Sequence, residues 1–344
     1  MAYRKNFSSS GHFLLEFIQN AEDAKASYIK IVLQPNFIEI YNNGAPFTYD
    51  DVEAICSIGR SKKRFKKDLR DYVGYLGVGF KSVFLISSAP HIYSHPYRFK
   101  FDKDFWHDPK QVPWQITPIW LDTVPEKYKI WNVVFYIPIN EYGYQLVKNE
   151  LDYFTPTTLL FLHNINEIEI EFDNKHKKFT IKRNENGIYT LEVEENGNRD
   201  ITKWMVFRKV VKVPPYIKND KFTISWDRKE VNKREIAVAF KLNEDGDLIP
   251  LKGTVKFGVF SYVPLKEEEL GLKFLIHGDF LVAPGREMIQ KEALWNKWML
   301  KEITNFIMKE IIPEFRKHPL WKYSYTEILY SDIHHPPFNA YLTE

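Results

Sequence analysis

The sequence predicts an α+β fold in two parts, an α/β first half and a strand-rich second half that ends in a helix. Three observations predict it. Segments with helical periodicity alternate with short apolar runs in the first half. From about Thr155, strand-like runs are separated by Asn-Gly turns. A long amphipathic segment over residues 291–312 then closes this half. We therefore expect one domain over residues 1–155 and a second over residues 156–344.

The first half contains a helix, a hairpin and several further elements in sequence. Residues 11–26 predict a helix because Phe13, Phe17 and Ala21 recur at helical spacing on one face. Residues 27–34 and 37–43 predict two strands joined at Pro35-Asn36. We then expect a helix near 50–56, a basic segment at 60–70, a glycine-rich stretch at 74–79 that leads into 80–87, strands near 91–101 and 130–139, and a helix near 141–153.

The second half is predicted to be a series of strands followed by one long helix. The long helix has an apolar side that includes Leu294, Trp298 and Ile303. The expected strands cover residues 158–164, 167–172, 178–184, 188–194 and 204–213.

The composition limits the classes of protein that this sequence can encode. The formal net charge is +3 over 344 residues, which argues against a protein whose main task is to coat nucleic acid. The single cysteine, Cys56, cannot form an internal disulfide and offers no metal cluster. No run of about 18 apolar residues occurs, and residues 1–10 are polar, unlike a signal peptide. We expect a cytoplasmic protein that does not bind a membrane.

Three polar residues are predicted to share one side of the first helix. Glu16, Asn20 and Asp23 lie at i, i+4 and i+7. An amide oxygen suits Mg²⁺, which takes one or two protein ligands beside phosphate oxygens. A carboxylate one turn away could orient a water as a general base. The alternative is a plain amphipathic helix with a solvated polar face.

Two further motifs have a functional and a plain interpretation. IYNNGAPF places Asn42, Asn43 and Gly44 at the end of an apolar strand. Gly44 would let the backbone approach a flat ligand, and Asn42 could accept from an exocyclic amine; the plain interpretation is a strand-ending turn. GYLGVGFKS, residues 74–82, has closely spaced glycines whose backbone N–H groups can face an anion. It is not a P-loop, because Phe80 separates Gly79 from the following lysine, and it lacks the third glycine of a dinucleotide fingerprint.

The order of the three motifs resembles that of the gyrase, heat-shock chaperone, histidine kinase and MutL (GHKL) ATPases. The amino-acid sequences of the motifs are most similar to those of the sacsin-type branch. The matching stretches are LLEFIQNAEDA, IYNNGAPFTYDDVEAICSIGRSKK and GYLGVGFKSVF. The resemblance covers residues 11 to about 100 and extends weakly beyond. It implies a Bergerat-type α/β sandwich, in which helices cover one face of a mixed sheet. A transducer-like or middle-like domain with C-terminal helices would follow.

The resemblance also implies a role for each matched residue. Glu16 would be the general base that activates water, and Asn20 the direct Mg²⁺ ligand. Asn42 stands where many relatives carry the aspartate that accepts from the adenine amine; an uncharged amide there predicts weaker adenine selectivity. The other expected ATP-binding residues are Asp23, Ala24, Gly44, Phe47, Arg60, Lys62, Gly74, Gly77, Val78, Gly79, Phe80 and Lys81.

These residues divide by the part of the nucleotide that they would meet. Gly44 would lie under the base and Phe47 against it, while backbone N–H groups of residues 77–80 would face the phosphates. Arg60 or Lys62 would reach the phosphates from the lid, and Lys81 either does so or points to solvent. PGREMIQ, residues 284–290, resembles the segment of the ninety-kilodalton heat-shock chaperones that brings an arginine to the γ-phosphate, which assigns that role to Arg286.

The sequence departs from the wider pattern in three places. Pro46 replaces the second glycine of the strand-end motif, and no Gly-Thr occurs near residues 131–134. Only about ten residues precede the first helix, which puts dimerisation by N-terminal strand exchange in question. A monomer and an ATP-dependent dimer both remain open.

Together the motifs predict a chaperone-like or molecular-switch ATPase that binds ATP with Mg²⁺ and hydrolyses it slowly, driving lid closure and domain rearrangement. The alternative is an ATP-gated interaction module with negligible hydrolysis, part of a larger chaperone, defence or DNA-processing protein, which would recruit a protein client or partner domain. A histidine kinase is disfavoured because Glu16 supplies a hydrolytic base. The basic segment, with seven Lys or Arg in residues 60–70, fits an ATP lid better than a nucleic-acid patch.

Overall fold

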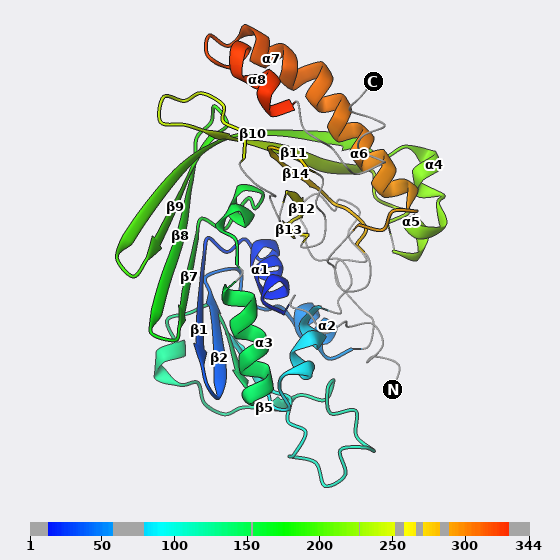
Figure 1. Cartoon of the computed structure of the whole chain (residues 1–344). Helices are drawn as coiled ribbons and strands as arrows, with labels where there is room; N and C mark the ends of the chain where they lie inside the picture. The colour runs from blue at the N-terminus through cyan, green and yellow to red at the C-terminus, as the bar shows by residue number, and fades with distance from the viewer. Residues whose placement is uncertain are drawn as a thin grey trace.

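The computed structural model describes residues 13–57, 79–152, 154–226, 228–251, 258–265, 271–282 and 289–329 (Figure 1). These residues form one large mixed sheet with helices packed against it, which confirms the α+β class. Among the described helices, none combines the length and the apolarity that a membrane crossing requires.

The described elements up to residue 172 agree with most of the segments expected from sequence. They are α1 (Phe13–Asp23), β1 (Tyr28–Gln34), β2 (Phe37–Asn42), α2 (Tyr49–Ile55), the 3-10 helix η4 (Gly79–Leu85), β3 (His91–Ser94), β4 (Tyr97–Lys100), β5 (Ile119–Trp120), the 3-10 helix η5 (Glu126–Tyr128), β6 (Val133–Pro138), α3 (Glu141–Asp152), the 3-10 helix η6 (Pro156–Leu160) and β7 (Glu167–Phe172).

The remaining elements begin with long strands and end with helices. They are β8 (Lys175–Arg183), β9 (Ile188–Glu195), β10 (Asn198–Lys212), α4 (Pro215–Lys218), α5 (Lys221–Ser225), β11 (Lys233–Leu242), β12 (Val259–Ser261), β13 (Val263–Pro264), β14 (Leu275–Gly278), α6 (Leu294–Phe306), the π-helical turn η7 (Ile307–Ile311), α7 (Ile312–Lys317) and α8 (Trp321–Leu329).

The sheet is continuous from one half of the chain to the other. Its described strands follow the order β13-β12-β14-β11-β10-β9-β8-β7-β1-β2-β6-β3-β4-β5. The pairs β1/β7 and β12/β14 are parallel, and the other pairs are antiparallel. Since β7 pairs with β1, with Ile31 opposite Ile170, the sheet is not interrupted at the boundary expected near residue 155.

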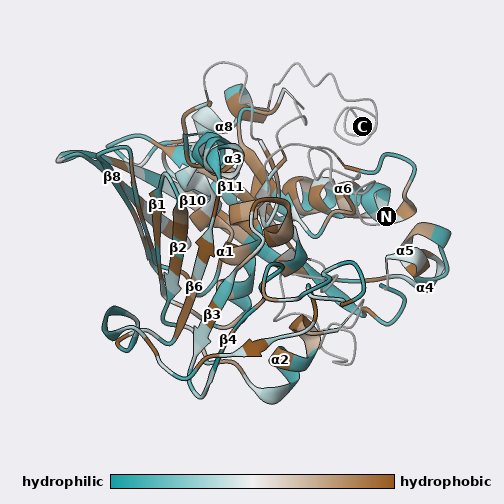
Figure 2. Cartoon of the chain, turned by 90° about the horizontal axis from the view of Figure 1, so that it is seen from below, coloured by the Kyte–Doolittle hydropathy of each residue, from teal (hydrophilic) through white to brown (hydrophobic). Residues whose placement is uncertain are grey.

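The first apolar core lies between α1 and the sheet. Alternation along the strands puts Ile29, Ile31 and Leu33 of β1 on the buried face, and β2 contributes Ile38 and Ile40. Figure 2 shows the hydrophobic residues along β2 and β6 beside the helix α1. The core extends into β7, β8 and β9 through Ile168, Phe179 and Leu191, so residues on both sides of 155 build it.

The second apolar core lies between β11, β14 and the C-terminal helices (Figure 1). Phe240 of β11 contacts both Phe274 and Phe315, with ring centroids 5.2 Å and 5.0 Å away. Trp298 and Ile303 of α6 are buried here, as the apolar side of the expected helix predicts, but Leu294, which was expected on the same side, is exposed at the start of the helix.

One expected strand, residues 158–164, is wrong. Residues 156–160 form the 3-10 helix η6, which Pro156 opens, and a loop follows. The carbonyls of this stretch accept hydrogen bonds from arginine side chains rather than from a neighbouring strand. Nη2 of Arg183 donates to the oxygens of Leu159, Leu162 and Ile165. An apolar run cannot reveal that its backbone will be satisfied in this way.

The expected helix over 291–312 starts at Leu294 and continues to Lys317. The chain widens into the π-helical turn η7 just before Pro313. Proline has no N–H to donate to the preceding turn, which accounts for the change of pitch at this place.

Candidate functional site

Helix α1 carries the first group of candidate residues, and a buried carboxylate fixes its first turn. The backbone N–H groups of Phe13 and Leu14 donate to Glu150 of α3, at 3.0 Å and 2.8 Å. Glu150 therefore acts as an N-terminal cap supplied by another helix, and its negative charge lies at the positive end of the helix dipole. This contact sets the position of α1 relative to α3.

The polar side of α1 is not a simply solvated face. Glu16 is only 7% exposed, and Asn20 and Asp23 are half-buried. Residues on the other sides of the helix, among them Phe17 and Ile18, are buried as well. A carboxylate that is nearly buried has a structural or functional reason to be there, because burial of an ionised group is costly. The structure thus disagrees at Glu16 with the interpretation of a plain amphipathic helix.

The end of α1 and the strand-end motif meet directly. The N–H of Ala45 donates to the carbonyl oxygen of Ala24 at 2.8 Å. A Cβ atom placed on Gly44 would lie 2.9 Å from Ala24 Cβ, closer than real Cβ contacts, so a glycine is needed for this approach. The first two sequence motifs, about twenty residues apart, therefore form one structural unit.

Asn42 lies on the inner face of the sheet beside this contact. The alternation of β2 places it in the row of Ile38 and Ile40, and it is 4% exposed. Its Oδ1 accepts a hydrogen bond from the N–H of Gly44 at 3.0 Å. The hydrogen bond to the N–H two residues on is the strand-ending turn of the plain interpretation, and Nδ2 of Asn42 has no hydrogen-bond partner among the described residues.

Phe47 and Phe80 join the same aromatic group around Phe135 of β6. The ring centroids of Phe47 and Phe135 are 6.1 Å apart, and those of Phe80 and Phe135 are 6.0 Å apart. Phe80 also lies 6.4 Å from Phe17 of α1, so η4, which begins at Gly79, packs beside that helix. The side chain of Phe80 lies in the apolar core. The phosphate contact expected of its backbone N–H stays a prediction.

Lys81 does not point to solvent. Its Nζ donates to the carbonyl oxygens of Ile55 and Gln115, the second at 2.9 Å. Burial lowers the pKa of Lys81 to about 8. Lys81 would have to leave these two carbonyls to reach a phosphate. In the structure it links the end of α2 to the loop that contains Gln115.

Six expected site residues lie outside the described residues. They are Arg60, Lys62, Gly74, Gly77, Val78 and Arg286. The roles expected of them stay predictions.

A group on the opposite, outer face of the sheet has the composition of a metal site. Glu169, Glu171 and His176 offer ligand atoms that lie within 4.8 Å of one another. However, Nζ of Lys30 lies 2.9 Å from Glu169 and 2.5 Å from Glu171. The ammonium already supplies the positive charge that a metal ion would bring, so the group is explained as an ion-pair cluster.

No family model matches the chain. Over 322 residues, or 86% of the chain, it is 27% identical to the protein NO VEIN of Arabidopsis thaliana, of which it covers 11%. Over 108 residues, or 26% of the chain, it is 35% identical to human sacsin, of which it covers 2%. The chain thus spans a small part of the length of both relatives. The likeness to sacsin is partial and agrees with the resemblance that the motifs indicate.

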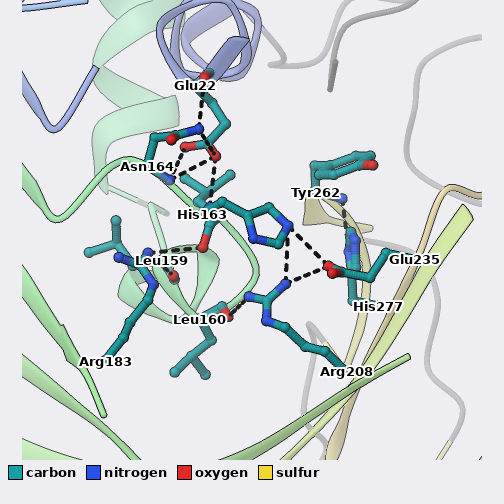
Figure 3. A network of polar contacts seen from close by, with 11 residues as sticks. Glu22, Leu159, Leu160, His163, Asn164, Arg183, Arg208, Glu235, Tyr262 and His277 are labelled. Atoms are coloured by element: carbon teal, nitrogen blue, oxygen red, sulfur yellow. Dashed lines mark hydrogen bonds and ion pairs between the residues drawn. The ribbon is translucent and has the colours of Figure 1, made fainter. Parts of the chain in front are cut away.

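Sequence reasoning missed Glu22, a buried residue of α1 whose carboxylate has several hydrogen-bond partners (Figure 3). Its carboxylate is 2% exposed and accepts from the backbone N–H groups of His163, Asn164 and Ile165, at 2.7 Å, 2.9 Å and 3.1 Å. A carboxylate near the C-terminal end of a helix is unfavourable for the helix dipole, and these N–H groups offset that effect.

The loop that Glu22 holds is tied in turn to the second half of the sheet (Figure 3). Arg208 of β10 donates to the carbonyl oxygen of Leu160 at 2.7 Å and to Glu235 of β11 at 2.5 Å. Nε2 of His163 lies 3.1 Å from the same Glu235 oxygen. Burial would raise the pKa of Glu235, but His163 and Arg208 outweigh it and hold the pKa at about 2. A continuous set of polar contacts therefore runs from α1 to β11.

A buried histidine, His277, lies next to this set of polar contacts. His277 of β14 is fully buried, stacks on Phe161 with ring centroids 5.2 Å apart, and accepts from the N–H of Tyr262 at 3.2 Å through Nδ1. Burial lowers the pKa of His277 to about 3, so the ring is neutral at physiological pH. The sequence contains one sign of these buried polar contacts. Arg208 follows Val206 on the same face of a strand, where an apolar residue would be expected.

Proposed function

We propose that this chain binds ATP together with Mg²⁺ at the junction of α1 and the end of β2 and hydrolyses it slowly. The observation that carries the proposal is the contact between Ala24 and the residues 44–45 turn, which joins two motifs of the GHKL pattern into one unit. Gly44 is required there by close packing, and Asn42 is a nearly buried polar residue beside it. The partial likeness to sacsin supports the same reading.

The donor set on α1 fits a magnesium ion that also contacts phosphate. Asn20 is half-buried and offers an amide oxygen, and Mg²⁺ prefers oxygen ligands while it keeps several waters. Asn20 would hold the ion, with Asp23 lining the same side of the helix. Bound Mg²⁺ would neutralise charge on the phosphate oxygens.

Glu16 is the residue proposed to act on water. It lies one helical turn before Asn20 and is nearly buried, so its carboxylate is shielded from bulk solvent. A carboxylate in this position can orient a water molecule and accept its proton as the water attacks the terminal phosphate. Glu150 and the N-terminal cap that it provides hold the helix that carries this group.

Closure of the lid and docking of Arg286 complete the proposed cycle. Arg286 would bring a positive charge to the γ-phosphate from the second half, as the resemblance implies. We propose a chaperone-like or switch role, in which the nucleotide state changes the arrangement of the two halves. The relatives are far longer than this chain, so partners are proposed only as a class, a protein client or partner domain.

A second candidate function is an ATP-gated interaction module with negligible hydrolysis. In this function the polar contacts from Glu22 through residues 163–165 to Arg208 and Glu235 would carry a change at α1 to the second half. Nucleotide binding alone could then bias the arrangement of β10 and β11.

Steady-state phosphate release from Mg·ATP separates the two candidates and tests the base. We expect Glu16→Ala to keep nucleotide binding and to stop turnover, because it removes the proton acceptor. Glu16→Gln is the matched variant, since it keeps the shape of the side chain. Equal hydrolysis rates in the wild type and both variants would remove Glu16 from the mechanism. A wild type that binds ATP with no measurable release would favour the interaction module.

A further inference from the structure

The amide of Asn42 has a single orientation in this structure. Its Oδ1 accepts from the N–H of Gly44 at 3.0 Å. The nitrogen of an amide cannot accept a hydrogen bond, so a flipped side chain would place two donors against each other. The backbone therefore decides which end of the amide faces Gly44.

The turn that supplies this N–H is itself held in place. Nδ2 of Asn132 donates to the carbonyl oxygens of Asn43 and Gly44, at 3.0 Å and 2.9 Å. Gly44 packs against Ala24 with no room for a Cβ, and Ala45 is hydrogen-bonded to Ala24. Because the turn is fixed on both sides, the orientation of Asn42 is fixed with it.

The other end of the amide, Nδ2, has no hydrogen-bond partner among the described residues. The residue as a whole is 4% exposed, yet Nδ2 itself is not fully enclosed, so an acceptor of a ligand or of solvent can reach it. An unpaired donor on the inner face of the sheet, beside the glycine of the turn, marks a place where a ligand acceptor would be stabilised. This observation is independent of the sequence resemblance.

We propose that Asn42 sets the base preference of the site and that 6-oxopurine nucleoside triphosphates bind at least as well as ATP. The inference rests on the proposed function, in which Asn42 meets the base. Adenine carries an amino group, a donor, at position 6, whereas hypoxanthine and guanine carry an oxygen, an acceptor, at the same place. The Nδ2 donor matches the oxygen. The adenine amine can use only the remaining lone pair of Oδ1.

An aspartate at position 42 would reverse this preference. Both carboxylate oxygens are acceptors, so one would keep the bond from Gly44 and the other would face the base. Asn42→Asp is therefore expected to favour the 6-amino base and to reject the 6-oxo base. Sites that are built around one hydrogen bond discriminate strongly against an analogue that cannot make it.

The test is a calorimetric titration of the full chain with ATP and with inosine triphosphate, both with Mg²⁺. The two nucleotides differ only at positions 1 and 6 of the base. For the wild type we expect a Kd for inosine triphosphate equal to or lower than that for ATP. For Asn42→Asp we expect ATP to bind more tightly by on the order of tenfold, the size of one hydrogen bond.

Asn43→Asp is the matched control, with the same change of charge one residue further on. Asn43 is exposed, and its Oδ1 accepts from the N–H groups of Ser27 and Tyr28, so it faces away from the inner side. This variant is expected to keep the wild-type ratio of the two affinities. A change equal to that of Asn42→Asp would mean that charge alone decides the preference, which would overturn the proposal.

The outcomes separate this inference from the function on which it rests. A wild type that prefers ATP by tenfold or more overturns the base preference and leaves ATP binding in place. Failure of both nucleotides to bind the wild type overturns the two proposals together. The wild-type ratio decides the matter even if Asn42→Asp does not fold.

Discussion

Two polar side chains near the end of α1, Glu22 and Asn42, differ in how completely their hydrogen bonds are made. The strand-end cluster consists of Ala24, Asn42 and Gly44, and the joint consists of Glu22, His163, Arg208 and Glu235. In the joint, both oxygens of Glu22 accept from backbone N–H groups. In the strand-end cluster, Nδ2 of Asn42 has no partner among the described residues.

This difference separates polar groups that hold the fold from those that are placed for a ligand. Glu22 is paired by the protein itself, so its removal should affect stability first. Asn42 keeps bonding capacity that the described residues do not use, so its replacement should affect binding first.

Glu22→Ala should cause the largest loss of stability. It leaves three N–H groups without their acceptor, that of Ile165 buried and those of residues 163 and 164 partly buried, and a fully buried group of this kind costs about 1–3 kcal/mol. We expect the free energy of unfolding to fall by about 3–5 kcal/mol, measured by denaturant titration. Glu22→Gln keeps one acceptor oxygen and should lose less. A loss below about 1 kcal/mol for the alanine variant would show that the joint does not stabilise the fold.

Arg208→Ala should have an intermediate effect. It removes the donor to the carbonyl of Leu160 and leaves Glu235 with His163 as its remaining partner of the joint. Because both charged side chains are about one-fifth exposed, we expect a loss of about 1–3 kcal/mol in thermal or chemical unfolding. Arg208→Lys keeps the charge but cannot donate to Glu235 and to the carbonyl oxygen of Leu160 at the same time. Its free energy of unfolding should therefore lie between those of the wild type and Arg208→Ala.

The stability of the wild type should fall as the pH is lowered below about 6.5. The pKa of His277 is held at about 3 in the folded protein by burial, with Glu235, Arg208, His163 and Asp279 as the charged groups around it. Below pH 6.5 the imidazole of His277 is protonated in the unfolded chain but stays neutral in the folded protein. The stability is therefore complete above pH 6.5 and is lost progressively toward pH 3.

The measurement compares unfolding at pH 7 and pH 5.5 in the wild type and in His277→Asn. His277 should contribute a loss of about 1 kcal/mol over this interval. Asparagine retains an acceptor for the N–H of Tyr262 but does not titrate, so the difference should shrink by that amount. An unchanged pH dependence in the variant would assign the effect to other groups, such as His91, whose pKa burial lowers to about 4.

Asn42→Asp should have the smallest effect on stability. The substitution keeps the acceptor for the N–H of Gly44 but places a carboxylate at a nearly buried position, so we expect a loss of no more than about 1 kcal/mol in the same unfolding experiments. A loss as large as that of Glu22→Ala would place Asn42 among the residues that hold the fold and remove the contrast between the two groups.

The sequence predicted best what depends on local periodicity. The spacing of Phe13, Phe17 and Ala21 located α1, and the alternation over residues 27–43 located β1 and β2 with their turn. The strand expected over residues 158–164 was wrong because arginines of β8 and β10, far along the chain, satisfy the carbonyls of that segment. Periodicity carries no information about such partners.

The candidate site was predicted only in part for the same reason. Glu16, Asn20 and Asp23 follow from helical spacing, and the approach of Gly44 to Ala24 agrees with the motif order. Glu22 could not be singled out, because its partners at 163–165 lie about 140 residues away in a segment that was expected to be a strand. The orientation of Asn42 also depended on a backbone turn that only the structure shows.

Calorimetric titration of the full chain with a non-hydrolysable ATP analogue shows whether α1 carries a magnesium–nucleotide site. The titration is run with and without Mg²⁺, on the wild type and on Asn20→Ala. We expect one site per chain in the wild type, much weaker binding without Mg²⁺, and loss of the Mg²⁺-dependent part in Asn20→Ala. Absence of binding in the wild type, or identical Mg²⁺ dependence in Asn20→Ala, would contradict the assignment of a magnesium–nucleotide site to α1.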